Sequence, residues 1–426
     1  MEEVSKLHVS WSEDRTLSRA VSRAVGTCLE KAACPVAAMV FSAGNWDRGA
    51  LARALNAELG HIPWVGSTAA IVFANSRVIR EGIAIGIISA ADACIGVGMS
   101  PNVSQNPALA GQKAVAMAID HMPELSFEAR ESADAADVSS NADVKERAAD
   151  GAADDAGKSR RAIWLLADSF MGEGSGIVQG AVREGGTSVC WSGVGVGGRG
   201  RRSGRMSLLA NGSAFLDRAV ALAIDLKKPF GSCLTHSREP FGPPLSVTRC
   251  RDRGSIVQEL DYCPAGECFE RVARAYGPEN LREADMRMLF KFCSIGIPMA
   301  DGGFVIRDIV QLNDRGELQF VAPVPEGCIV RLMRGEPENL IRGASEAARK
   351  AVSQAGGRTG GLIFADCDGR ALFLGDDVGR ELAEINRAAG EGTDVLGCTS
   401  YGEVGRLSDG FPQFHNRSIQ VTALPA

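Results

Sequence analysis

The sequence lacks the features that mark membrane, secreted and zinc-binding proteins. It has no run of about 18 apolar residues that could span a bilayer. Residues 1–6 show neither a signal-peptide pattern nor the basic, acid-poor composition of a transit peptide. None of the 12 cysteines belongs to a C-x-x-C pair, and the 5 histidines do not cluster with them. We therefore expect a cytoplasmic protein with reduced, mostly buried thiols and no metal site.

A strong excess of charge of one sign is also absent. The formal net charge is −6, and apolar and charged residues make up 45% and 23% of the chain, as in ordinary globular proteins. This balance gives no general attraction to nucleic acid. The basic cluster at 199–205 lies among glycines and is more typical of a solvated turn. A length of 426 residues predicts two or three domains.

One pattern is present three times. Each copy has an apolar run, an amphipathic segment, a second apolar run and a turn of small residues. The copies occupy about 37–70, 162–195 and 361–403. Such repetition predicts duplicated strand–helix–strand units. It also places small-residue loops at equivalent strand ends, where mixed α/β folds build ligand sites.

The segments between these copies vary in character. Residues 128–160 contain no Leu, Ile, Phe, Trp or Tyr, which predicts a disordered surface insertion. Asn211-Gly212 predicts a hairpin turn, and we expect a helix over 214–226. The Pro- and Gly-rich stretch 228–244 is typical of a linker or a domain boundary.

These segments predict two α/β domains with mixed sheets and flanking helices. An N-terminal helix within 1–36 leads into a first domain over 37–230, which the insertion 128–160 interrupts. A second domain follows over 245–426. We expect the small-residue loops of the two domains to face a shared cleft.

Several motifs make the chain similar to FIST proteins over nearly its whole length, with both the N-terminal and the C-terminal FIST domain. The motifs are Gly66–Ala69, Ser192–Gly198, Ile256–Asp261, Pro264-Ala265, Phe304–Arg307, Val324–Gly327, Leu362–Arg370, Gly397–Glu403 and His415-Asn416. The first turn, Gly66–Ile71, departs from the family because it lacks a Gly-Glu pair like Gly402-Glu403.

The resemblance implies a non-catalytic, intracellular sensory module that binds amino acids or related small carboxylates. Bacterial relatives are coupled to signalling outputs, and eukaryotic ones to an F-box for ubiquitin ligation. The sequence shows no output domain and no room for an F-box ahead of residue 30. We therefore expect the output to pass through a separate signalling or ubiquitin-ligase partner, and an adaptor role in such a complex is the alternative.

The residues that we expect to bind the ligand gather near the third copy of the pattern. The turn at 397–403 offers backbone donors, small hydroxyls and a carboxylate. Arg370 either clamps a ligand carboxylate or forms a structural ion pair with Asp366 or Glu403. The candidates are Cys367, Arg370, Ser400, Tyr401, Glu403 and His415, supported by Ser67 and Thr68.

Other interpretations use the same residues. Glu403 could instead cap a neighbouring segment, and Cys367 with His415 could form the nucleophile pair of a hydrolase. Some relatives bind haem and respond to nitric oxide, for which His61 and His415 are the axial candidates. The glycines at 193–200 lead into a strand rather than a helix, which argues against dinucleotide binding.

Overall fold

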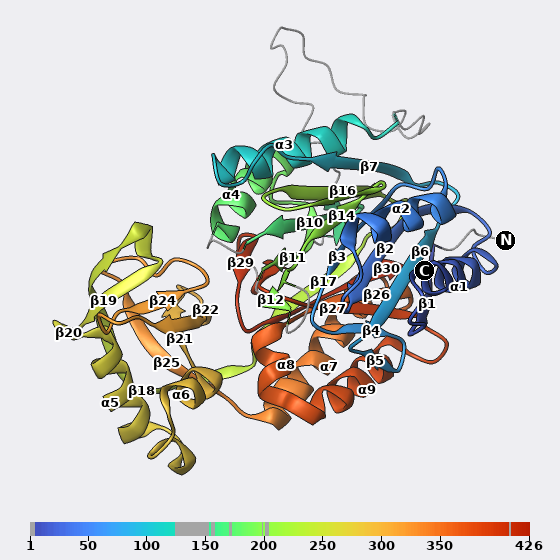
Figure 1. Cartoon of the computed structure of the whole chain (residues 1–426). Coiled ribbons are helices and arrows are strands. Elements are labelled where there is room, and N and C mark those ends of the chain that lie inside the picture. Colours follow the sequence, from blue (N-terminus) through green and yellow to red (C-terminus); the bar gives the residue numbers. More distant parts are fainter. Residues whose placement is uncertain are drawn as a thin grey trace, which may run out of the picture.

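The computed structural model describes residues 5–123, 153–154, 158–169, 173–197, 199–200, 204–408 and 410–426. Most of the predicted insertion 128–160 lies outside these residues. The fold is mixed α/β with helices flanking mixed sheets, as predicted (Figure 1). None of the described helices is long and apolar enough to cross a bilayer.

The first module covers residues 6–89. Its elements are β1 (Lys6–Ser12), α1 (Leu17–Leu29), β2 (Pro35–Ala43), α2 (Arg48–Leu59), β3 (Trp64–Thr68), β4 (Val72–Ala74), β5 (Arg77–Ile79) and β6 (Gly82–Ser89). The strands β2 and β3 are parallel, and β6 pairs antiparallel with both β1 and β2.

The second module covers residues 94–225 and repeats this order. Its elements are β7 (Cys94–Met99), α3 (Pro107–Asp120), β10 (Arg161–Asp168), α4 (Gly174–Gly185), β11 (Cys190–Val196), β14 (Leu208–Ala210), β15 (Ser213–Phe215) and β16 (Ala219–Asp225). Two small ladders accompany it, formed by β8 (Ala153–Asp154) with β9 (Lys158–Ser159) and β12 (Arg199–Gly200) with β13 (Gly204–Arg205).

The third module comprises residues 231–235 and 337–425. Its elements are β17 (Gly231–Thr235), α7 (Pro337–Gln354), β26 (Thr359–Cys367), α8 (Asp368–Leu374), α9 (Val378–Ala389), β27 (Val395–Ser400), β28 (Glu403–Gly405), β29 (Gln413–His415) and β30 (Ile419–Pro425). A short 3-10 turn at Gly375–Asp377 joins α8 to α9.

The three modules exchange their hairpins in a cycle. The sheet orders are β1-β6-β2-β3-β14-β15, β7-β16-β10-β11-β28-β29 and β17-β30-β26-β27-β4-β5. The hairpin β4–β5 of the first module therefore completes the third sheet beside β27. The hairpin β14–β15 of the second completes the first sheet beside β3, and β28–β29 of the third completes the second beside β11.

The inserted region, residues 238–335, interrupts the third module and lies to one side of the other sheets (Figure 1). Its elements are β18 (Arg238–Arg251), β19 (Ile256–Leu260), β20 (Cys263–Pro264), α5 (Ala265–Tyr276), α6 (Met286–Phe292), β21 (Cys293–Pro298), β22 (Phe304–Arg307), β23 (Ile309–Leu312), β24 (Leu318–Phe320) and β25 (Ile329–Gly335), with 3-10 turns at Asp252–Gly254 and Glu279–Leu281.

The sheet of the inserted region curls strongly. Its strands follow the order β22-β21-β25-β18-β19-β24-β23, and β20 pairs with β19. The strands at its two ends, β22 and β23, are separated in the chain only by Asp308. The two edges of this sheet must therefore approach each other at Asp308.

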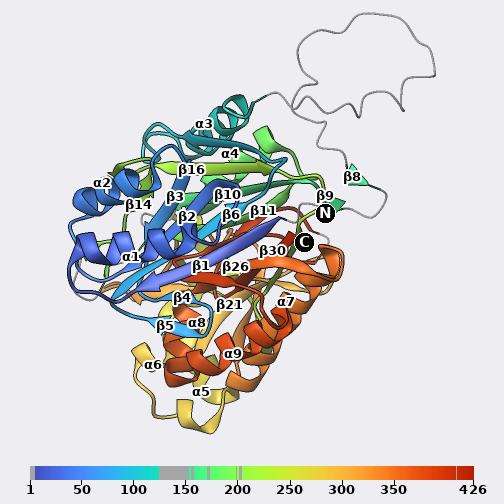
Figure 2. The same ribbon diagram turned by 90° about the vertical axis from the view of Figure 1, so that its right-hand side faces the viewer.

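The apolar cores follow this architecture. One cluster joins the inner faces of the three sheets, with Met39, Trp164 and Ile363 among its members. Three further clusters lie under the helices of the modules: α1 and α2 on the first sheet, α3 and α4 on the second, and α7 to α9 on the third (Figure 2). The inserted region has a fifth cluster of its own.

Two sequence-based expectations in the connecting segments are wrong. Residues 214–226 form β15 and β16 rather than a helix. Six of the seven residues of β16 are buried between β7 and β10, and periodicity does not distinguish such a continuous apolar run from a buried helix. Residues 228–244 hold β17 and the start of β18 rather than a linker, although the border between the third module and the inserted region falls within them.

Local sequence features explain why the hairpin turn was predicted correctly and why the prolines of β18 were misleading. Asn211 and Gly212 have φ of 39° and 88° and form the predicted hairpin turn between β14 and β15. Pro243 and Pro244 fall where the pairing of β18 with β25 shifts register, between Phe241 and Leu245. A proline is tolerated at such an irregularity because no ladder hydrogen bond is lost there.

Candidate functional site

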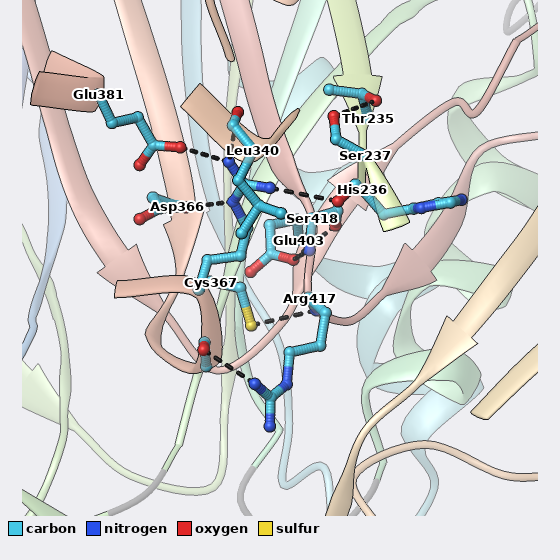
Figure 3. A network of polar contacts seen from close by, with 12 residues as sticks. Thr235, His236, Ser237, Leu340, Asp366, Cys367, Glu381, Glu403, Arg417 and Ser418 are labelled. Carbon is cyan, nitrogen blue, oxygen red and sulfur yellow. Dashed lines mark hydrogen bonds and ion pairs between the residues drawn. The ribbon is translucent and has the colours of Figure 1, made fainter. Parts of the chain in front are cut away.

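A buried polar cluster lies where β26 and β27 end and where the third module meets the inserted region. Figure 3 shows Asp366 and Glu381 on one side of it, and Cys367, Glu403, Arg417 and Ser418 on the other. The side chains come from the β26–α8 corner, from α9, from the start of β28 and from the loop between β29 and β30. This is the part of the molecule to which the sequence patterns pointed.

Arg370 lies at the centre of an ion-pair network and is fully buried. Its Nε donates to Asp366 Oδ1 at 2.9 Å, and its Nη2 forms a short contact with Glu381. The backbone oxygens of His236 and Leu340 each accept from the guanidinium at 3.3 Å. Of the two roles expected for Arg370, the structure shows the ion pair with Asp366.

The carboxyl group of Asp366 holds its proton more tightly than usual. Burial and the neighbouring Glu381 raise the pKa of Asp366 well above its ordinary value, against the opposing effect of Arg370. Its Oδ2 has no hydrogen-bond partner among the described residues. Two carboxyl groups thus share one guanidinium, and burial favours the protonated form of Asp366.

Glu403 is also fully buried, and its carboxyl group accepts hydrogen bonds from two serines in different segments of the chain. Its Oε1 accepts from Ser400 Oγ at 2.5 Å, and its Oε2 accepts from Ser418 Oγ at 2.6 Å and from Ser418 N at 3.2 Å. Gly402 precedes it with φ of 141°, and a Cβ there would lie 2.1 Å from the ring of Phe414. The carboxyl group therefore joins the turn after β27 to the start of β30, in keeping with the capping interpretation.

The protonation of Glu403 predicts how stability depends on pH. Burial raises its pKa from 4.5 to about 8. The stability that this group contributes is full below pH 4.5 and is lost as the pH rises through 8. Between pH 6.5 and 8 the loss is about 2 kcal/mol, at about 1.4 kcal/mol per unit. We expect Glu403→Gln to remove this part of the decline, as measured by urea unfolding at pH 6.5 and 8.5.

The buried histidines of the cluster affect stability only below this pH window, so the stability change within the window reports on Glu403. Burial lowers the pKa of His236 to about 4 and that of His415 to about 3, so their cost to stability grows only below pH 6.5. Ser67→Ala, which changes a buried hydroxyl in the first module, is the control and should keep the full decline. An unchanged pH slope in Glu403→Gln would contradict the protonated state of Glu403.

Cys367 and His415 are both buried but do not form a nucleophile pair. Cys367 Sγ accepts from the backbone N of Arg417 at 3.2 Å, and no hydrogen bond between Cys367 and His415 is present among the described residues. Burial and the charge of Glu403 raise the pKa of Cys367 well above its ordinary value. The thiol form, which is a poor nucleophile, is therefore favoured.

Two further arginines at this junction are buried without a carboxylate in contact among the described residues. Arg238 donates from Nη1 to Phe292 O at 3.1 Å, and its Nε and Nη2 have no partner in the part of the chain that is described. Arg307 donates only to backbone oxygens, including Pro323 O at 2.9 Å and Phe414 O at 3.3 Å. Burial lowers the pKa of Arg238 to about 9 and that of Arg307 to about 10.

His415 adds an unpartnered nitrogen to the same junction. Its Nε2 is buried and has no hydrogen-bond partner among the described residues. The nearby charge of Arg307 is the second cause of its low pKa, after burial. His415 also lies opposite Glu403 in the β28–β29 ladder.

Arg417 ties the inserted region to the third module. Its Nε forms an ion pair of 2.7 Å with Asp308 Oδ1, at the point where the curled sheet meets itself. Its other nitrogens donate to Phe290 O and Lys291 O of the inserted region at 2.8 and 3.0 Å, and to Gly369 O of the third module at 2.9 Å. Arg417 thus contacts both sides of the junction.

The remaining predicted site residues lie at other junctions between modules. Thr68 Oγ1 accepts from Ser207 N at 2.9 Å, and the preceding Ser67 is buried in β3. Tyr401 N donates to Gly195 O at 2.7 Å. In the part of the chain that is described, no hydrogen bond joins Ser67 or Thr68 to Glu403. The small-residue turns therefore join neighbouring modules.

Among the described residues, the centre of the three sheets holds only a small void. A void there has a volume of about 10 Å³ and is lined mainly by apolar residues, Met39, Phe41 and Trp164 among them. This is at the lower limit for one water molecule. The polar junction described above is the better candidate for a binding site.

The histidines proposed for haem do not fit that group. His61 is exposed at the end of α2. His415 is buried beside the guanidinium of Arg307 and the imidazole of His236, whereas haem needs an apolar pocket. The described residues also contain no cluster of three or more His, Cys, Asp or Glu side chains that could hold a metal ion.

The sequence patterns missed several members of the cluster. Arg238 lies in the stretch that we read as a linker. Arg307 ends the motif Phe304–Arg307, to which we assigned no ligand contact, and Asp308 follows it. The available signal was an arginine or aspartate beside apolar strand residues, as in Phe304–Asp308. Charged residues are seldom fully buried, so this signal is weak by itself.

Comparison with known families assigns the chain to one of them. The FIST N domain matches residues 36–262, and the FIST C domain matches residues 265–406. No curated protein matches the chain. FIST domains are associated with sensing in signal transduction. The two matches cover most of the sequence, and the chain belongs to the FIST family.

Proposed function

We propose that this protein is a sensory module that binds a small ligand with an anionic group, such as an amino acid or a related small carboxylate. The proposed site is the junction of the third module with the inserted region. The observation that carries the proposal is the pair Arg238 and Arg307, which are buried and have only backbone oxygens as hydrogen-bond partners among the described residues.

Charge and solvation support this proposal. A buried guanidinium without an anionic partner is costly. A ligand carboxylate could accept from two donors of one guanidinium at once. Arg238 Nε and Nη2 are two donors of this kind without partners among the described residues. An anionic ligand at this position would offset the cost that the protein bears without it.

The closed state of the junction suggests how binding would be read out. Arg238 and His415 are 4% and 3% exposed, so a ligand has to displace part of the packing between the inserted region and the third module. Binding would then shift the balance between two packings of these parts. We infer that a separate partner protein recognises one of them.

The state of Cys367 favours binding over catalysis. Its thiol is buried beside Glu403 and has a raised pKa, which is the opposite of what a cysteine nucleophile requires. We therefore infer that the ligand is bound and released unchanged. Steady turnover of any ligand found for this site would contradict that inference.

A thermal-shift screen with amino acids and small carboxylates tests the proposal. A ligand at 100 times its Kd adds about 2.7 kcal/mol of stability. In Arg238→Met we expect the shift to vanish, because losing a buried charge contact costs about 2–5 kcal/mol. Without ligand, this variant should be at least as stable as the wild type, because it lacks an unpaired buried charge.

Arg249→Met is the matched control, since Arg249 lies on the same strand β18 with its side chain 63% exposed. It should keep both the ligand-induced shift and the stability of the wild type. A ligand whose shift survives Arg238→Met would place the site elsewhere. A screen without any hit would contradict the proposed ligand class.

A further inference from the structure

Ser294 is a serine of the inserted region whose hydroxyl group has no hydrogen-bond partner in the part of the chain that the structure describes. It lies on β21 and is completely buried. Burying a hydroxyl group without a hydrogen bond is costly. A serine hydroxyl can both donate and accept, so this group is available to a bound molecule in either role.

The side chain of Ser294 lies on the outer face of the curled sheet, away from the core of the inserted region. The residues on either side of it, Cys293 and Ile295, belong to that core. Because successive side chains of a strand point to opposite faces, Ser294 faces outward. Its partner across the ladder is Met333 of β25, which therefore lies on the same outer face.

Arg238 lies on this outer face too. It pairs with Gly335 of β25, two residues beyond Met333, so that β25 separates it from the strand of Ser294. The guanidinium passes over β25 where that strand has no side chain, since a Cβ at Gly335 would lie 3.4 Å from Arg238 Cζ. It ends at Phe292 O, to which Nη1 donates at 3.1 Å. Phe292 is two residues before Ser294, at most about 7 Å along the chain.

Together, Arg238 and Ser294 can hold more than a carboxylate. The donors of Arg238 without partners among the described residues are Nε and Nη2, and two donors of one guanidinium can bind both oxygens of one carboxylate. The hydroxyl group of Ser294 then remains for a second polar group of the ligand. Since a single strand separates the two side chains, this second group has to lie close to the carboxylate.

The charges of the junction distinguish a hydroxyl group from an ammonium group at this second position. The four carboxyl groups described above each have a partner: Asp366 and Glu381 share Arg370, Asp308 pairs with Arg417, and Glu403 binds Ser400 and Ser418. Burial is the main cause of the lowered pKa of Arg238, and the charges of Arg417 and Arg370 add to it, although Asp308 opposes them. An ammonium group beside Arg238 would thus meet further cations and no free carboxylate, whereas a hydroxyl group carries no charge.

We propose that Ser294 is the second ligand contact of this site and that the ligand is a small 2-hydroxy acid, with its carboxylate on Arg238 and its hydroxyl group on Ser294. This inference rests on the proposed function, since it takes the same site and narrows the class of ligand. Each of the two hydroxyl groups can donate or accept. One hydrogen bond between them satisfies Ser294, which has no partner in the protein without ligand.

Two sets of probes that differ only at carbon 2 test the class of ligand. The first is propionate, lactate and alanine, and the second is succinate, malate and aspartate. Within each set, carbon 2 carries hydrogen, hydroxyl or ammonium. In thermal-shift titrations of the full-length protein, we expect the hydroxy acid of at least one set to bind about tenfold more tightly than the unsubstituted acid, as for one hydrogen bond, and more tightly than the amino acid.

Ser294→Ala separates a ligand contact from a structural role. We expect the hydroxy acid to lose its tenfold advantage, while the unsubstituted acid binds as it does to the wild type. Without ligand, the variant should be at least as stable as the wild type, because it removes an unpaired buried hydroxyl group. Ser67→Ala, which removes a buried hydroxyl group from the first module, is the matched control and should keep the preference.

The outcomes distinguish this inference from the proposed function. A preference for the hydroxy acid that survives Ser294→Ala would overturn the inference and leave the proposed site intact. So would equal binding within a set, or tighter binding of the amino acid, provided that Arg238→Met abolishes the shift. A shift that survives Arg238→Met, or no shift with any of the six probes, would contradict the proposed site and this inference with it.

Discussion

Arg370→Met is expected to destabilise the protein by about 3–5 kcal/mol, because it leaves two buried carboxyl groups without their common cation. Arg370 is fully buried between Asp366 and Glu381. The side chain of methionine fills a similar volume, so the loss reflects charge rather than a cavity. Urea unfolding at pH 7, followed by far-UV circular dichroism, measures the change.

A compensated variant separates this effect from a role in ligand binding. Arg370→Met combined with Asp366→Asn and Glu381→Gln removes the guanidinium together with both ionisable carboxyl groups, and we expect it to recover most of the lost stability. If Arg370→Met instead keeps its stability and loses only the response to ligand, then the arginine is a ligand clamp and the ion pairs are secondary.

Phe73→Ala should cost about 3–5 kcal/mol, the usual range for removing a buried phenylalanine ring. Phe73 is 1% exposed, and its ring centroid lies 5.1 Å from that of Phe364. It belongs to the first module in sequence but packs in the core under α7 to α9. The change therefore damages the third module through a residue of the first.

The unfolding profile of Phe73→Ala tests the exchange of hairpins. All 5 tryptophans, at positions 11, 46, 64, 164 and 191, belong to the first two modules. Because these modules share strands with the third, we expect tryptophan fluorescence and circular dichroism to change together at a lower urea concentration. A fluorescence transition that stays at the wild-type midpoint would mean that the modules unfold independently.

Arg77→Ala is the matched control on the same hairpin. The side chain of Arg77 is 54% exposed and pairs with Glu13 at 3.0 Å. An exposed ion pair contributes at most about 1 kcal/mol, so this variant should unfold close to the wild type.

The repeated units could be predicted from the sequence, whereas their assembly could not. The three copies of the pattern coincide with the parallel pairs β2–β3, β10–β11 and β26–β27. Periodicity reports how one segment buries one face. It says nothing about which sheet a short hairpin joins, and β4, β14 and β28 have only three residues each.

The candidate site was predicted in part, for a similar reason. Small residues and polar groups at the ends of β26 and β27 pointed to Cys367 and Glu403, which lie together in Figure 3, and to Arg370, which pairs with the neighbouring Asp366. Arg238 and Arg307 were missed because their burial depends on the fold of the inserted region. A buried arginine and an exposed one have the same appearance in a sequence.

The cyclic exchange of hairpins also limits how the chain can be divided. The FIST N match, residues 36–262, contains β11 but not β28, which pairs with it. It also contains β4, whose partner β27 lies in the FIST C match. Expressed alone, such a fragment would expose open strand edges, which invite aggregation and strand swapping. In a pair of such fragments, the open edges of β11 and β4 could pair only with strands that they do not meet in the intact chain. The whole chain is therefore the smallest unit in which every sheet is complete.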